Sequence, residues 1–226
     1  MGMGWHDRLD IKEWICWLVR QYPDSEIVLY GVSMGAAAVM MAAGEKLPSN
    51  VKAAVEDCGY TSAWSVLSYQ MKSQFHLPAF PFLYCADFVT RIRAGYGMKE
   101  ADALKCVAGT RLPMFFIHGT EDRFVPFEMM KELYDACRSE KECLAVAGAA
   151  HVQAALVGGA EYWDRVFRFV DRYWKDSRQR YRFWRLIPIN GRLFGYLKPM
   201  ISIINIKSNV KDLTLHMVYC YTNENI

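Results

Sequence analysis

The chain has 226 residues, enough for one domain of ordinary size with a full hydrophobic core. Hydrophobic residues make up 53% and charged residues 23% of it, which excludes disordered and collagen-like chains. Residues 1–174 hold 18 Lys and Arg against 21 Asp and Glu, whereas residues 175–226 hold nine against three. The body is therefore mildly acidic and the tail basic, so the overall charge indicates little about partners.

Cysteine usage and hydropathy indicate a cytoplasmic protein. The seven cysteines are scattered and include no C-x-x-C pair, which favours reduced thiols over disulfides or a zinc site. The opening residues do not resemble a signal peptide. Two uncharged runs, 27–44 and 143–160, reach the lower edge of membrane-spanning length. Both are rich in Gly and Ala with a polar residue in the middle, so we interpret them as buried strand–turn–helix segments.

The predicted elements alternate between helix and strand along residues 1–174. The expected helices are Asp7–Arg20, Ala36–Ala43, Pro126–Arg138 and Tyr162–Trp174. The expected strands are Glu26–Tyr30, Val51–Glu56, Pro113–His118 and Cys143–Val146. This order predicts an α/β fold with a mostly parallel sheet covered by helices on both faces.

Residues 60–110 interrupt the alternation. They are rich in aromatic residues, contain Met and Pro, and include no clear strand, so we expect two or three irregular helices forming an inserted cap. The aromatic side chains could cover an apolar substrate pocket, with Tyr60 and Trp64 as candidate lining residues. The alternative is that most of them form the core of the cap itself.

The pentapeptide Gly31-Val32-Ser33-Met34-Gly35 follows the first predicted strand and precedes a helix rich in small residues. A catalytic serine sits on such a strained strand-to-helix turn, where Gly31 and Gly35 allow strand and helix to approach closely. The sequence therefore predicts Ser33 as a nucleophile on an elbow. The alternative is an ordinary loop serine.

A serine nucleophile needs a base, and the base needs an acid that orients it. Asp122 follows the third predicted strand and is our candidate acid, although an Asp before a helix can be a simple cap. Glu121 beside it and Asp57 after the second strand are alternatives. We interpret His118, at the end of the third strand, as structural.

His151 follows the fourth predicted strand, on a loop of small residues that lets an imidazole approach the serine. It is the only histidine after Asp122 apart from His216 in the basic tail. Ser33, Asp122 and His151 thus occur at successive strand ends in the chain order of an α/β-hydrolase.

Four segments, YGVSMGAA, VEDCGYTS, PMFFIHGTEDRFVPFEMM and AGAAHVQA, together resemble the α/β-hydrolase superfamily, in particular bacterial serine-aminopeptidase-like hydrolases. The resemblance covers residues 1–174, and its most specific part is the string His118 to Pro126. It implies Ser33 as nucleophile, His151 as base, Asp122 as acid and the backbone N–H of Met34 as an oxyanion donor. It also implies an ester, thioester or small amide substrate cleaved through an acyl-enzyme, without cofactor or metal.

The chain departs from this family in its order. Only one helix and one strand precede Ser33, whereas the family has several strands and an oxyanion loop there, so residues 1–174 resemble the later part of the domain. We therefore expect Glu26–Tyr30 to form an exposed sheet edge that allows self-association. A truncated or frameshifted gene would explain this order. The alternative function is a catalytically weak or silent half-domain that associates with a partner or with itself.

The basic tail, residues 175–226, contains no repeat or known module. It mixes Arg with aromatic residues, but without a regular amphipathic period. We therefore expect neither nucleic-acid binding nor membrane association through it.

Overall fold

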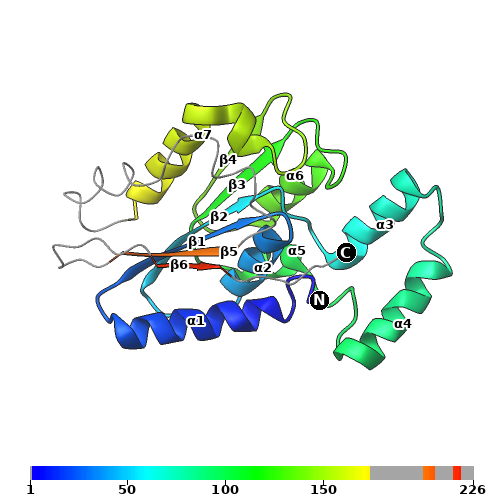
Figure 1. The fold of residues 1–226 in the computed structure, drawn as a ribbon, viewed down its shortest axis with the longest axis horizontal. Helices are drawn as coiled ribbons and strands as arrows, with labels where there is room; N and C mark the ends of the chain where they lie inside the picture. The colour runs from blue at the N-terminus through cyan, green and yellow to red at the C-terminus, as the bar shows by residue number, and fades with distance from the viewer. Residues whose placement is uncertain (1, 174–200, 207–215, 220–226) are drawn as a thin grey trace.

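The computed structural model describes residues 2–173, 201–206 and 216–219, so most of the basic tail lies outside the described residues. Its centre is a parallel sheet of four strands in the order β4-β3-β2-β1, extended beyond β1 by two antiparallel strands (Figure 1). The strands are β1 Glu26–Val32, β2 Val51–Asp57, β3 Met114–Gly119, β4 Lys141–Val146, β5 Ile201–Ile206 and β6 His216–Tyr219. The predicted fold class, an α/β protein with a mostly parallel sheet, is confirmed.

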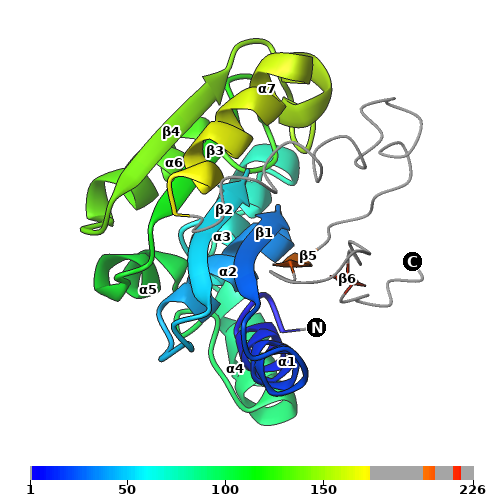
Figure 2. The same cartoon turned by 90° about the vertical axis from the view of Figure 1, so that its left-hand side faces the viewer.

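Seven helices surround the sheet in the described residues. They are α1 Asp7–Gln21, α2 Met34–Ala43, α3 Ala63–Gln74, α4 Phe82–Ala94, α5 Ala103–Gly109, α6 Phe127–Ala136 and α7 Ala154–Asp171. Helices α1, α2, α5 and α6 pack on one face of the sheet and α7 on the other, with a separate apolar core in each layer (Figure 2). No helix in the described part of the chain is long and apolar enough to cross a membrane.

Helix α2 occupies the centre of the larger core. Nine of its ten residues are buried, so the helix is apolar on all sides, as expected for one enclosed by other elements. Its many alanines keep the helix thin enough to lie close to the sheet behind β1. The residue run 27–44 is thus β1, a turn and α2, as the composition indicated.

Helix α7 begins at Ala154 rather than at the predicted Tyr162. Its first turns and its main part meet at a kink at Gly159, whose φ of 51° is non-helical. The stretch before the kink consists mostly of small residues without an apolar stripe. It therefore gave no helical period in the sequence.

The expectation of an exposed edge at Glu26–Tyr30 is wrong. Strand β5 pairs antiparallel with β1 from Glu26 opposite Ile206 to Gly31 opposite Ile201. The backbone N–H and C=O groups of β1 that a missing neighbour would leave unpaired are therefore bonded to a segment of the tail. This segment, ISIINI, has the β-branched composition typical of strands.

Three helices lie between β2 and β3, in agreement with the predicted two or three, but they do not together form one cap. Helix α5 packs against α2 and α6 in the body. Only α3 and α4 project beyond the sheet (Figure 1). The projecting cap is therefore the α3–α4 pair, shorter than residues 60–110.

Candidate active site

Ser33 lies on a tight turn between β1 and α2. Its φ of 56° falls in the left-handed region, which is strained for a residue with a side chain. Its backbone N–H donates to the carbonyl of Asp57 at 2.8 Å, which fixes the turn to the end of β2. A Cβ atom at Gly31 would lie only 2.3 Å from the carbonyl oxygen of Gly35, so the turn requires glycine there. Met34 begins α2, where the first N–H groups have no acceptor within the helix.

The structure brings His151 to Ser33. The distance from Ser33 Oγ to His151 Nε2 is 2.8 Å, although 118 positions separate the two residues. The ring of Phe124 lies against the imidazole, with 4.8 Å between the ring centroids. One face of His151 is thus covered by an aromatic ring, while a fifth of the side chain stays exposed.

Asp122 holds the other side of the imidazole. Its Oδ2 lies 2.7 Å from His151 Nδ1, and its Oδ1 accepts the backbone N–H groups of Phe124 and Val125 at 2.8 and 2.9 Å. Burial alone would raise the pKa of Asp122, but hydrogen bonds from His118 and His151 outweigh it and hold this pKa well below its usual range. The carboxylate is therefore ionised at neutral pH. A proton on Nδ1 donated to it leaves Nε2 free to accept from Ser33.

The other two candidate acids lie in different environments. Glu121 is exposed, and no hydrogen bond of the described residues joins its carboxylate to His151. Asp57 is buried and its Oδ2 accepts the hydroxyl of Tyr162 at 2.7 Å, which in turn lies 2.7 Å from the hydroxyl of Tyr30. Burial raises the pKa of Asp57 to about 6. The geometry thus favours Asp122 over both alternatives.

His118 has a contact that the sequence did not reveal. Its side chain is fully buried, and Nε2 lies 3.0 Å from the carbonyl of Val125 and 3.2 Å from Asp122 Oδ2. Burial lowers the pKa of His118, but the hydrogen bond to Asp122 and the charge of Glu56 raise it by more, so the net shift is upward. His118 therefore supports the loop that carries the acid. The only sequence signal was its place four residues before Asp122.

Tyr60 and Trp64, the candidate pocket residues, lie in different surroundings. Tyr60 is 3% exposed and belongs to the larger core. Trp64 is half-buried, with the Lys99 ammonium 4.4 Å from its ring centroid and Tyr84 packed edge-on. Neither residue makes a described contact with Ser33 or His151, so a substrate-lining role stays a prediction.

One group of side chains in the described part of the chain has the spacing of metal ligands. Cys58, Asp122 and His151 each offer a ligand atom, all within 4.8 Å of one another. Asp122 and His151 are already hydrogen-bonded to each other, and burial raises the pKa of the Cys58 thiol well above its usual value. A neutral thiol is a poor metal ligand, so the arrangement suits a hydrogen-bonded catalytic group better than a metal centre.

Glu56 makes the stability of this region depend on pH. It is fully buried, and its burial raises its pKa from 4.5 to about 8. Because the pKa of Glu56 is higher in the folded than in the unfolded chain, Glu56 stabilises the fold below pH 4.5, and this stabilisation is lost as the pH rises through about 8. The pKa values of Asp57 and His118 are also raised, so these two residues likewise make the fold less stable as the pH rises. We expect Glu56→Gln to reduce the fall in the free energy of unfolding between pH 5 and 8, by on the order of a few kcal/mol.

Urea unfolding at the two pH values measures this effect. The exposed Glu132→Gln variant is the control and should keep the wild-type pH dependence. If the free energy of unfolding of Glu56→Gln fell between pH 5 and 8 by as much as that of the wild type, Glu56 would have to be ionised throughout this range.

The sheet order, the helices on both faces and the serine, aspartate and histidine at strand ends are those of an α/β-hydrolase. No family model matches the chain. The chain is 29% identical over 149 residues to the α/β hydrolase domain-containing protein aho-3 of Caenorhabditis elegans, covering 66% of this chain and 37% of the relative. It is 24% identical over 169 residues to the uncharacterized protein YqkD of Bacillus subtilis (strain 168), covering 74% and 55%.

Solved structures give the same result. The esterase Pf2001 of Pyrococcus furiosus superposes with a TM-score of 0.58 at 26% identity, over 76% of this chain and 64% of the esterase. The acylaminoacyl peptidase of Pyrococcus horikoshii gives a TM-score of 0.56 at 18% identity, over 79% and 30%. The α/β-hydrolase superfamily that the motifs predicted is thereby confirmed. The chain spans about half the length of the first curated relative, and less than two thirds of these structures.

Proposed function

We propose that the chain is a serine hydrolase that cleaves an ester, thioester or small amide through an acyl-enzyme. The observation that carries the proposal is the continuous hydrogen-bonded line from Ser33 Oγ through both ring nitrogens of His151 to Asp122, at 2.8 and 2.7 Å. The similarity to an esterase and to an acylaminoacyl peptidase supports ester and amide substrates as a class.

In this mechanism Ser33 Oγ attacks the substrate carbonyl while His151 Nε2 takes the hydroxyl proton. Asp122 keeps the proton of Nδ1 on the side away from Ser33 and stabilises the imidazolium that forms. His151 then donates its proton to the leaving alcohol, thiol or amine, which leaves the acyl group on Ser33. A water molecule, activated by His151 in the same way, hydrolyses the acyl-enzyme.

The negative charge on the carbonyl oxygen needs hydrogen-bond donors during both steps. We assign this role to the N–H of Met34, because Met34 opens α2 directly after Ser33 and the helix dipole favours negative charge there. Three protein side chains and a backbone amide thus supply the nucleophile, base, acid and oxyanion donor. The proposed chemistry therefore uses no cofactor, and the free cysteines of the described residues suit a reducing, cytoplasmic setting.

A fluorophosphonate probe tests the proposal directly, because it reacts only with an activated serine. We expect stoichiometric labelling of the folded protein, with the adduct on the peptide that contains Ser33 in a mass-spectrometric digest. Protein unfolded in urea is the control and should stay unlabelled. A folded sample that takes up no probe, or carries it on another serine, would contradict the assignment and favour the catalytically silent alternative.

A further inference from the structure

The projecting cap has a surface that the proposed chemistry does not use. Fifteen large apolar side chains are well exposed in the described residues, and eight of them lie between positions 75 and 92. We call these eight the cap patch. Its members are Phe75, Leu77, Phe80, Phe82, Tyr84, Phe88, Val89 and Ile92, each 40 to 70% exposed.

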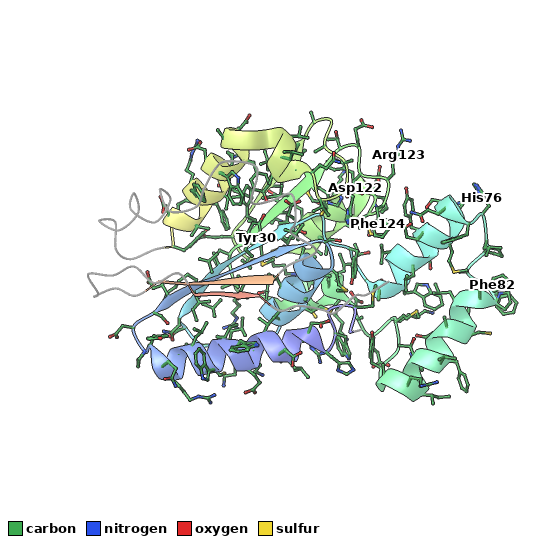
Figure 3. The ribbon with its side chains drawn as sticks, viewed as in Figure 1. Tyr30, His76, Phe82, Asp122, Arg123 and Phe124 are labelled. Atoms are coloured by element: carbon green, nitrogen blue, oxygen red, sulfur yellow. The ribbon has the colours of Figure 1, made fainter. Side chains whose placement is uncertain are left out.

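The cap patch is not the core of the cap. Between residues 72 and 93 only Leu83 is buried, so the alternative that these aromatic side chains form the core of the cap is wrong for this segment. Tyr84 packs edge-on against Phe80 and Trp64, but it remains exposed. His76 and Phe82 lie at the outer edge of the cap, on the side away from the sheet (Figure 3). An apolar surface of this extent on a projecting element is typical of a docking site.

The charges around the cap patch indicate what it contacts. Residues 60–99 hold four Lys and Arg (Lys72, Arg91, Arg93 and Lys99) against the single acid Asp87. Arg91 pairs with Asp87 at 3.1 Å and with Glu100, the residue directly after this range, at 2.7 Å, so the cap cations outside these two ion pairs are Lys72, Arg93 and Lys99. The remainder of residues 1–174 holds 14 Lys and Arg against 20 Asp and Glu. The cap is therefore a basic, aromatic element on an acidic body. A negatively charged surface therefore attracts the cap and repels the acidic body of the protein.

We propose that the cap patch docks the protein on an anionic lipid bilayer. Phe, Leu and Ile side chains enter the boundary between headgroups and acyl chains, and neighbouring Lys and Arg attract acidic headgroups. The acidic body orients the protein with the cap toward the bilayer. This contact lies in the cap and is independent of the basic tail.

The element that carries the cap patch is connected to the candidate active site. The side chain of Gln70 in α3 donates to the carbonyl of Phe124, whose ring packs on His151. The cap is thus joined directly to the loop that carries Asp122. Substrates with acyl chains dissolved in the bilayer would reach the site from this side.

Co-sedimentation of the full chain with vesicles tests the proposal. We expect binding to phosphatidylcholine vesicles containing half phosphatidylglycerol, and at least tenfold weaker partitioning of the variant Phe80→Ser/Phe82→Ser/Phe88→Ser. The partition coefficient of the variant Lys72→Gln/Arg93→Gln should fall roughly fivefold for each cation removed, because a basic residue near the membrane surface contributes about 1 kcal/mol to binding. Added salt should weaken the binding of wild type.

The matched control is Trp14→Ser/Trp17→Ser, which removes two exposed aromatic side chains from α1, outside the cap. It should bind as wild type does, and so should Ser33→Ala, since docking does not depend on hydrolysis. Circular dichroism melts establish that each variant is folded. Equal binding of the triple Phe variant and wild type would overturn the proposal in favour of the basic tail. Absent vesicle binding, with a dimer of wild type that the triple variant abolishes, would instead make the patch an interface between copies.

Discussion

Ser33→Ala is expected to lower kcat for a p-nitrophenyl ester by on the order of 10⁵- to 10⁶-fold, as loss of the nucleophile does in serine proteases. The reason is geometric. Ser33 Oγ is the hydroxyl oxygen hydrogen-bonded to the His151–Asp122 pair, and without it the proposed acyl-enzyme on Ser33 cannot form. The fold should be retained, because Ser33 is half-buried and its backbone, which forms the turn, is unchanged.

The control for this experiment is Ser49→Ala, which removes an exposed serine hydroxyl in the loop before β2. Steady-state hydrolysis by both variants, with thermal melts to establish folding, measures the effect. Hydrolysis by Ser33→Ala at the wild-type rate would assign the activity to another group or to a contaminant.

Asp122→Asn is expected to lower kcat by on the order of 10⁴-fold with little change in KM, as the equivalent change does in a serine protease. The carboxylate accepts from Nδ1 of His151, which fixes the proton on that nitrogen. An asparagine amide that donates to Nδ1 instead would move the proton to Nε2. The imidazole could then no longer accept from Ser33.

Glu121→Gln is the matched control, because Glu121 is the adjacent acid and is exposed. It should hydrolyse the ester at close to the wild-type rate. If Glu121→Gln lost more activity than Asp122→Asn, or if Asp57→Asn did, the acid would have been assigned to the wrong carboxylate. Fluorophosphonate labelling of Ser33 should slow in parallel with kcat.

Local patterns predicted the elements that carry the site. The strand Glu26–Tyr30 and the glycines beside Ser33 indicated β1, its turn and α2, since close approach of strand and helix excludes side chains there. The order of Ser33, Asp122 and His151 at strand ends predicted that they would be neighbours, because carboxyl ends of parallel strands share one edge. The structure places these three within hydrogen-bonding distance.

Some contacts between side chains of the site could not be predicted from the sequence pattern. No period links His118 to Asp122 or Phe124 to His151, because these contacts depend on how the loop after β3 folds back. The sequence also did not predict the start of α7 before the kink at Gly159. This short stretch is held by packing of Ala154 and Ala155 in the core between α7 and the sheet and has no apolar stripe of its own.

The sequence by itself determined the class of fold and the three residues of the candidate site, because periodicity and chain order are local properties. Only the tertiary structure decided what borders β1 and what the cap exposes. Strand β5 satisfies the backbone groups of β1, which the order of elements had left without a neighbour. The aromatic side chains of α4 face outward because a projecting pair of helices has too little area to bury them. Burial and pairing between distant segments depend on the whole chain, and no local pattern encodes them.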